Sequence, residues 1–259
     1  MTAVLVAMAA LFGLLIGSFL NVVIARVPAG ESIVAPGSRC GACGTPILAR
    51  DNIPVVSWLL LGRKCRACKA PISGRYPAVE VLTALLFAAV AARFGWAAEL
   101  PAYLYLTAIG VALAFIDLDV RRLPDAIVLP SYPVMAVLLT GAAAASGDWS
   151  DLLRAALGGL ALGGFYFALV FAYPAGMGFG DVKLSGILGM SLGYLGWPEV
   201  GVGAFLGFLY GGVVGVVLLV VGRAGRKSAI PFGPFMLLGT LTAVLFGGAI
   251  ADAYANVLL

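Results

Sequence analysis

The stretch AVLVAMAALFGLLIGSFLNVVI, residues 3–24, contains no charged side chain. An apolar run of this length covers the roughly 30 Å hydrocarbon core of a bilayer as a single helix. No Lys or Arg precedes Arg26, and no clear cleavage site of small residues follows the run. We therefore expect a retained membrane helix and not a removed signal peptide.

The rest of the chain has the same character, because 62% of its 259 residues are hydrophobic and only 11% are charged. A soluble domain of this length needs far more polar side chains to cover its surface. We predict an all-α polytopic membrane protein with about eight transmembrane helices. They are expected near residues 3–24, 78–94, 101–118, 126–146, 152–173, 182–197, 200–222 and 233–254.

Positive charge is concentrated in alternate connections between these runs. The residues concerned are those from Arg26 to Arg75, Arg121 and Arg122, Lys183, and Arg223, Arg226 and Lys227. The positive-inside rule makes these connections cytoplasmic, with both termini on the other side. The net charge of +4 then reflects topology, and no motif supports nucleic-acid binding.

The first connection is too long to be a turn and holds all four cysteines. Cys40 and Cys43 form one CxxC pair, and Cys65 and Cys68 form a second pair after 21 intervening residues. This spacing is typical of a closed tetrahedral zinc site. Two disulfides are disfavoured by a reducing cytoplasm, and four free thiols are disfavoured by the paired spacing. We expect one structural zinc ion.

The chain is thereby divided into three predicted parts. Residues 1–26 form the first membrane helix, residues 27–77 a small cytoplasmic zinc domain, and residues 78–259 a membrane-embedded core.

The sequence contains no histidine. A Ser-His-Asp triad, an HExxH metal site and a Ser-His membrane protease dyad are therefore excluded. Carboxylates, lysines, hydroxyls and the cysteines remain available for chemistry.

Two carboxylates stand where membrane spans end on the predicted cytoplasmic side. Asp117 follows the apolar residues AFI, and Asp181 follows the glycine-rich stretch GMGFG. Ionisable groups at membrane depth are costly and indicate function by default. Two acids brought together in a low dielectric share one proton, as in aspartic proteases, where one carboxylate activates water and the other polarises the amide carbonyl.

The glycines before Asp181 fit this hypothesis. Gly176, Gly178 and Gly180 allow backbone angles and close approach that side chains forbid, so a substrate backbone has room beside Asp181. In the alternative interpretation, Asp181 is an ordinary N-cap, Lys183 an interfacial anchor and the glycines a flexible loop.

The stretch around Asp117 also leaves an alternative open, in which Asp117 is an interfacial charge paired with Arg121 at i+4. Asp119 fits a structural role better, because two residues of helix turn it to nearly the opposite face. Asp125, directly after Pro124, is expected to cap the next helix.

Several strings together resemble a known family. They are GSFLNVVIARVP at 17–28, the two CxxC pairs with DNIPVVSWLLLGRKC at 51–65, RYPAVE at 75–80, FIDLDVRRLPD at 115–125, GMGFGDVKL at 176–184 and IPFGPF at 230–235. Their order is similar to that of bacterial type IV prepilin peptidases, which are GxGD-type intramembrane aspartic proteases. Members cleave the basic leader from type IV prepilins and type II secretion pseudopilins, and most then methylate the new N-terminal amine with S-adenosylmethionine.

The resemblance implies Asp117 and Asp181 as the catalytic pair, with Gly178, Gly180 and Lys183 in the supporting loop. It implies a zinc module at the four cysteines, which is associated with the bifunctional form of the enzyme. For the methyl donor no Rossmann glycine loop is present in residues 27–80. Candidates are Arg75, Tyr76 and Glu80, together with Gly62 to Lys64, although Glu80 also fits an interfacial residue.

The expected substrates are prepilins and pseudopilins, cleaved where a basic leader meets an apolar helix. The expected location is the inner membrane, with the zinc domain and the active site on the cytoplasmic side. Two other classes stay open on residues alone. A carboxylate-dependent transporter predicts acids near the midplane and repeated halves, and a zinc-stapled assembly factor predicts that Asp117 and Asp181 are ordinary boundary charges.

Overall fold

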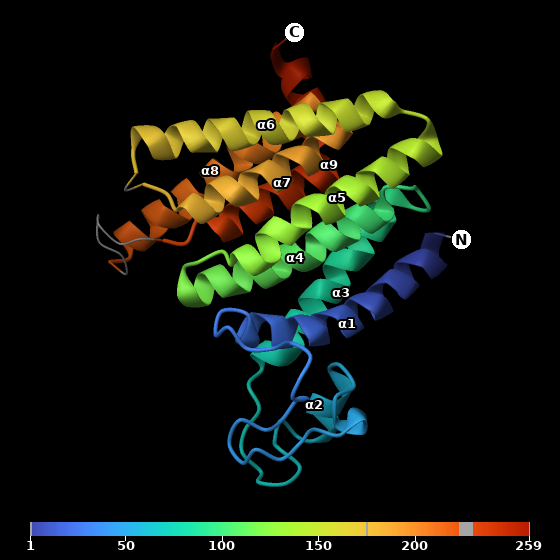
Figure 1. The fold of residues 1–259 in the computed structure, drawn as a ribbon, viewed down its shortest axis with the longest axis vertical. Coiled ribbons are helices and arrows are strands. Elements are labelled where there is room, and N and C mark those ends of the chain that lie inside the picture. The colour runs from blue at the N-terminus through green and yellow to red at the C-terminus, as the bar shows by residue number, and fades with distance from the viewer. Residues whose placement is uncertain (1, 175, 223–229, 259) are drawn as a thin grey trace. The chain divides into compact units, whose positions relative to one another are not determined.

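The computed structural model describes residues 2–174, 176–222 and 230–258. Within these ranges the chain is helical apart from loops and two isolated β-bridges. The helices (Figure 1) are α1 (Thr2–Arg26), α2 (Val56–Leu60), α3 (Arg75–Phe94), α4 (Leu100–Val120), α5 (Asp125–Ser146), α6 (Trp149–Ala172), α7 (Phe179–Leu195), α8 (Trp197–Val220) and α9 (Gly233–Leu258), with a 3₁₀ helix η1 at Ala49–Asp51. The predicted all-α fold is confirmed.

All eight predicted apolar runs form helices, and their ends differ from the predicted ones by at most four residues. Seven described helices are long and apolar enough to cross a membrane, namely α1, α3, α4, α5, α6, α8 and α9. The run predicted at 182–197 is the 17-residue helix α7. At about 1.5 Å per residue it spans only about 26 Å, which is less than the roughly 30 Å of a hydrocarbon core.

A first compact unit comprises Met1–Leu100 and Thr107–Ala112. In it, α1 and α3 pack closely because glycines of α1 lie at the contact. A Cβ on Gly13 would lie 2.8 Å from the Cα of Ala84, and one on Gly17 would lie 2.7 Å from the Cα of Glu80. Small residues at such contacts are typical of membrane helices, whose association depends on close packing. The connection from α1 to α3 contains η1, α2 and the four cysteines.

A second unit comprises Pro101–Leu106 and Leu113–Leu259. Its central element is α7, which contacts α5, α6, α8 and α9 (Figure 1) and has twelve of its 17 residues buried. Glycines again allow a close helix contact, since a Cβ on Gly158 of α6 would lie 2.6 Å from the carbonyl oxygen of Gly189 of α7. The shortest of the long helices is thus largely enclosed by protein.

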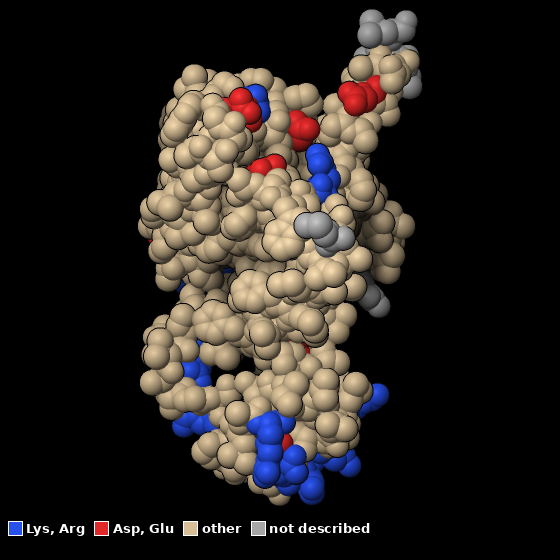
Figure 2. All heavy atoms as spheres, turned by 90° about the vertical axis from the view of Figure 1, so that its right-hand side faces the viewer, with Lys and Arg blue, Asp and Glu red and all other residues tan. Residues whose placement is uncertain are grey.

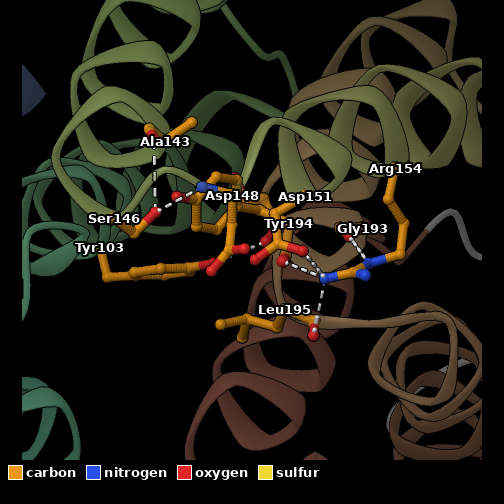
Figure 3. A network of polar contacts seen from close by, with 10 residues as sticks. Tyr103, Ala143, Ser146, Asp148, Asp151, Arg154, Gly193, Tyr194 and Leu195 are labelled. Carbon is orange, nitrogen blue, oxygen red and sulfur yellow. Dashed lines mark hydrogen bonds and ion pairs between the residues drawn. The ribbon is translucent and has the colours of Figure 1, made fainter.

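The C-terminal end of α7 is capped by a side chain of α6 (Figure 3). The Arg154 guanidinium donates hydrogen bonds to the carbonyl oxygens of Gly193, Tyr194 and Leu195, at 2.8, 2.8 and 3.3 Å. It also pairs with Asp151 at 2.9 Å. Carbonyl groups at a helix end have no partner within the helix, so Arg154 lets α7 end inside the protein.

Positive charge gathers on the segment between α1 and α3, where Lys and Arg side chains cluster on the surface (Figure 2). The exposed cations there are Arg39, Arg50, Arg63, Lys64, Arg66 and Lys69. Three other predicted cytoplasmic cations, Arg223, Arg226 and Lys227, lie outside the described residues.

Candidate aspartyl active site and cysteine cluster

Asp117 lies in the last turn of α4, and only 5% of its surface is exposed. The backbone N–H of Gly233, the first residue of α9, donates a hydrogen bond to Oδ2 of Asp117 at 3.1 Å. The sequence also allowed Asp117 to be an interfacial charge paired with Arg121. The structure instead buries the Asp117 carboxylate and gives it a backbone N–H donor. Asp119, two residues later, is exposed.

Asp181 lies in the first turn of α7 and is 8% exposed. Its Oδ2 accepts a hydrogen bond from the backbone N–H of Gly178 at 3.1 Å, which closes the start of the helix. The alternative interpretation made Asp181 the N-cap residue, but Gly178 occupies that position and Asp181 bonds back to it from the third position of the helix. Burial sets this carboxylate apart from an ordinary cap, because caps are usually solvated at one side and a buried acid needs a compensating partner.

The two carboxylates are close enough for the charge of one to act on the other. Leu123, in the loop between α4 and α5, contacts the start of α7 and the start of α9. A Cβ on Gly180 would lie 3.1 Å from its Cβ, and a Cβ on Gly233 would lie 3.3 Å from its Cδ2. A Cβ on Gly233 would also lie 2.8 Å from Oδ2 of Asp117. The starts of α7 and α9 and the end of α4 thus converge, and this convergence brings the two predicted acids together.

The glycines of the loop before Asp181 act through close approach more than through backbone angle. Gly178 is extended (φ −76°, ψ 149°), a conformation open to any residue. A Cβ on Gly176 would lie 3.0 Å from the Cε1 atom of the Tyr173 ring, and Gly180 packs against Leu123. The expectation of forbidden angles is wrong at Gly178, while close packing accounts for Gly176 and Gly180.

Lys183, one turn into α7, forms an ion pair with Asp125, the first residue of α5, with Nζ 2.8 Å from both carboxylate oxygens. Asp125 was expected to cap its own helix, but Pro124 occupies the cap position and Asp125 makes no capping hydrogen bond. The Tyr132 hydroxyl of α5 donates to the Lys183 carbonyl oxygen at 2.6 Å. Two side chains of α5 therefore hold the first turns of α7.

An aromatic cluster lies beside Asp181. Tyr166 of α6 is fully buried and close enough to Asp181 for an electrostatic interaction. Its ring stacks on Phe208 of α8 with centroids 5.5 Å apart, and Phe208 lies 5.2 Å from Phe232. Because Phe232 directly precedes Gly233, these rings form an apolar wall next to the two carboxylates.

The four cysteines form one cluster in the first unit. The sulfur atoms of Cys40, Cys43, Cys65 and Cys68 all lie within 4.8 Å of one another, and the Cys40 and Cys68 sulfurs are 3.8 Å apart. Two thiolates on a tetrahedral zinc ion, with Zn–S bonds of about 2.3 Å, lie about 3.8 Å apart. The sulfur positions therefore fit a tetrahedral metal site.

Each cysteine pair sits in the same kind of turn. The backbone N–H of Cys40 donates to the Thr45 carbonyl at 2.9 Å, and that of Cys65 donates to the Ala70 carbonyl at 2.8 Å. The sequences repeat as well, with CGACGTPI at 40–47 and CRACKAPI at 65–72. The left-handed position taken by Gly44 in the first turn (φ 71°) is taken by Lys69 in the second (φ 59°). The repeat was a further sequence signal for two matching halves of a metal site.

The surroundings favour thiolates at two of these positions. Hydrogen bonds with the hydroxyl and backbone of Thr45 lower the pKa of the Cys43 thiol to about 6. Backbone N–H groups of Cys68 and Ala67 lower the pKa of the Cys65 thiol. Although the Ala70 backbone N–H lowers it, hydrogen bonds with Cys43, Cys65 and Cys40 raise the pKa of the Cys68 thiol to about 11. Metal binding requires the deprotonated form, so the surroundings favour that form at Cys43 and Cys65 but not at Cys68.

Of the residues predicted to bind the methyl donor, some line a common cavity and others do not. Tyr76 and Glu80 line a cavity of about 1300 Å³ in the first unit, whereas Arg75 and residues 62–64 are not among its lining residues. Glu80 is 7% exposed and accepts a hydrogen bond from the backbone N–H of Val55 at 2.7 Å. Glu80 is therefore buried and has a hydrogen-bond partner that the sequence did not reveal.

The motif strings alone did not single out Gly233 or Leu123, although both lie within them. Gly233 is the glycine of IPFGPF, and Leu123 precedes the proline of LPD. The sequence signal for these two residues was that they lie in the unusual stretches IPFGPF and LPD. Their contact with the two aspartates depends on how the helices pack.

Two parts of the chain match known protein families. Residues 11–94 match the bacterial peptidase A24 N-terminal domain, and residues 104–251 match the type IV leader peptidase family. No solved structure matches the chain.

Curated relatives with the name prepilin leader peptidase/N-methyltransferase align over most of the chain. The protein of Aeromonas hydrophila is 38% identical over 272 residues, which cover 94% of this chain and 91% of the relative. That of Bacillus subtilis is 33% identical, with 96% and 97% covered. That of Myxococcus xanthus is 44% identical, with 83% and 64% covered. On the family match and these identities, the chain belongs to the type IV leader peptidase family.

Proposed function

We propose that this protein is a multi-pass membrane enzyme that cleaves the leader peptide from type IV prepilins and type II secretion pseudopilins, and then N-methylates the new N-terminus. The observation that carries the peptidase proposal is the burial of Asp117 and Asp181 at converging helix ends in a chain of this family. A transporter or a non-enzymatic assembly factor would not account for both the family membership and this pair.

In the proposed peptidase reaction Asp117 and Asp181 share one proton. The ionised carboxylate takes a proton from the attacking water, and the protonated one hydrogen-bonds to the scissile carbonyl. Gly233 N–H and Gly178 N–H orient one oxygen of each acid, which leaves the other oxygens for water and substrate. Gly180 lets Leu123 pack closely beside Asp181, and Lys183 positions α7 through Asp125.

The proposed metal is zinc, bound by Cys40, Cys43, Cys65 and Cys68 in a structural role. Four cysteine ligands leave no open position for substrate, and the sulfur spacing suits this ion. The ion would stabilise the segment of residues 27–77, which has few buried apolar side chains of its own.

The proposed methyl donor is S-adenosylmethionine, in keeping with the name of the relatives. When bound it would supply an activated methyl group on a sulfonium centre. Residues 27–77 are the proposed zinc domain and residues 78–259 the proposed peptidase core. The proposed binding residues for the donor, Tyr76 and Glu80, lie where these two ranges meet.

The proposed location is the inner membrane, with the cysteine segment and both aspartates on the cytoplasmic side. The exposed cations of residues 39–69 support this sidedness through the positive-inside rule. A basic leader followed by an apolar helix would then present its cleavage point at the depth of Asp117 and Asp181.

Reconstituted protein incubated with a purified prepilin and S-adenosylmethionine tests the proposal. Mass spectrometry is expected to show loss of the leader and the addition of one methyl group to the mature N-terminus. An uncleaved prepilin would contradict the peptidase proposal, and a cleaved but unmethylated product at saturating donor would contradict the methyltransferase proposal.

A further inference from the structure

A cavity of about 1300 Å³ lies in the first unit, outside the aspartyl site. Its walls come from the C-terminal half of α1, the start of α3 and the cysteine-containing connection between them. Small-molecule sites usually measure about 300–1000 Å³. The cavity therefore has room for a cofactor and, beside it, the end of a peptide chain.

Glu80 of α3 forms one wall of this cavity and is buried to more than nine-tenths, with 7% of its surface exposed. Its hydrogen bonds come from neutral donors, the Val55 N–H at 2.7 Å and the Ser18 hydroxyl. Burying a carboxylate is costly unless a cation or several donors compensate. A buried acid on a cavity wall, held by neutral groups, is suited to a cationic ligand.

The donor to Glu80 has an unusual backbone conformation. Val55 has φ 60° and ψ −49°, a region that β-branched residues avoid for steric reasons. Such strain costs about 1–3 kcal/mol and is found mostly at functional sites, where surrounding structure holds it. Here it directs an N–H group at the carboxylate of Glu80, which fixes that side chain on the cavity wall.

An aromatic side chain of α2 forms another wall. The indole N–H of Trp58 donates to the Ile72 carbonyl at 3.1 Å, and the Arg63 guanidinium lies 4.8 Å from the centre of the ring. Trp58 also lines the cavity. The Arg63 guanidinium covers one face of the ring, so an adenine ring would stack on the opposite face.

Cations and the cysteine cluster complete the walls. Arg26 and Arg39 line the cavity, and so do Cys40 and Cys65. The carboxylate of an amino-acid group would find a guanidinium partner here. The bound metal would lie in the wall, so its loss would disturb the cavity.

We propose that this cavity is the S-adenosylmethionine site of the proposed methyltransferase, with Glu80 facing the cationic sulfonium and amino groups and Trp58 stacking on the adenine. This inference rests on the proposed N-methyltransferase function. In the reaction the free N-terminal amine of the cleaved substrate bonds to the methyl carbon. The methyl–sulfur bond breaks, its electron pair stays on sulfur, and the nitrogen releases one proton to water.

Binding of S-adenosylhomocysteine, the demethylated donor, tests the site without any turnover. Isothermal titration calorimetry is carried out on the full-length, zinc-loaded protein in detergent. Glu80→Gln removes the charge and keeps an acceptor for Val55, and Ala25→Trp fills the cavity from an exposed position on α1. The matched controls are Glu99→Gln and Ala7→Trp, which lie in the same unit away from the cavity.

Both cavity variants are expected to raise the dissociation constant about tenfold or more. At Glu80 the lost hydrogen-bonded charge contributes at least that factor, and at position 25 the indole would take up space that the compound needs. Both controls should keep the wild-type value, and all four variants should cleave prepilin within about twofold of the wild type. Because Ala25→Trp leaves Glu80 intact, it decides the outcome if Glu80→Gln fails to fold.

Unchanged affinity in the folded cavity variants would overturn the site, and so would a wild-type protein that binds no S-adenosylhomocysteine. Displacement of bound S-adenosylhomocysteine by the donor itself supports the site. A basic leader peptide that binds the cavity in place of either compound would overturn it. Prepilin cleavage measured in parallel separates these results from a failure of the peptidase function.

Discussion

The ammonium group of Lys183 in α7 lies 2.8 Å from both carboxylate oxygens of Asp125 in α5. The pair joins the start of α5 to the first turns of α7, the helix that carries Asp181. The Tyr132 hydroxyl of α5 reinforces the same contact, at 2.6 Å from the Lys183 carbonyl oxygen. Lys183, which the sequence suggested as an interfacial anchor or as part of the supporting loop, is thus paired with a third acid, Asp125. Its effect on the dyad is one of position.

Exchange of the two charges tests this positioning. Lys183→Met is expected to lower the turnover number for prepilin cleavage about two- to fivefold with little change in KM, because partly exposed pairs contribute only about 0.5–1 kcal/mol. The double variant Asp125→Lys with Lys183→Asp is expected to recover most of the loss. The deficit of the single variant should shrink as salt rises, since salt screens exposed pairs. Steady-state kinetics at two ionic strengths measure this, and a salt-independent deficit with no recovery would contradict the role.

Gly233 provides a second test of the dyad's geometry. Gly233→Ala would place a Cβ 2.8 Å from Oδ2 of Asp117, so the carboxylate must move. We expect about a tenfold or larger loss of prepilin cleavage without unfolding. Gly164→Ala in α6 is the matched control, because a Cβ there meets nothing within 4 Å. Equal activity of the two variants would show that the position of Asp117 tolerates displacement.

The cap at the other end of α7 is expected to contribute stability and no chemistry. Arg154→Gln removes charge-assisted hydrogen bonds to the carbonyl oxygens of Gly193, Tyr194 and Leu195 (Figure 3). The expected loss is about 2 kcal/mol, seen as a thermal midpoint lower by several degrees. Cleavage well below the midpoint should stay near the wild-type rate. An unchanged midpoint would mean that the last turn of α7 is held by its glycine packing alone.

Metal analysis of the purified protein tests the cysteine cluster. About one zinc per chain is expected for the wild type. Cys40→Ser and Cys65→Ser, one from each turn, should each lose the ion and make residues 27–77 sensitive to protease. Thr2→Ser is a matched control outside the cluster. A metal-free protein whose cysteine segment resists protease would contradict the site.

The fold was largely predictable because the bilayer imposes a length and an apolar composition on each span. Each apolar run, such as residues 3–24, can be recognised as a membrane span from its own length and composition, without knowledge of the helices that it contacts. The cysteine cluster was predictable for a related reason, since the CxxC spacing of Cys40 and Cys43 is a local property. Its partner pair was found in the same way.

Tertiary contacts were less accessible to sequence reasoning. Asp125 followed a proline and looked like a cap, but its partner is 58 positions away at Lys183. Gly233 donates to Asp117 across 116 positions. No periodicity or local spacing encodes such contacts, because they arise only once α4, α5, α7 and α9 pack. The hidden partner of Glu80, a strained Val55, was inaccessible for the same reason.

The central claim is that the buried carboxylates of Asp117 and Asp181 carry out leader cleavage. The most direct measurement is the rate of prepilin cleavage by Asp117→Asn and Asp181→Asn, with Asp119→Asn, an exposed neighbour on α4, as the control. Each dyad variant is expected to lose at least about 100-fold in rate while its thermal midpoint stays near that of the wild type. The control should cleave normally. Cleavage at the wild-type rate by either dyad variant would contradict the account.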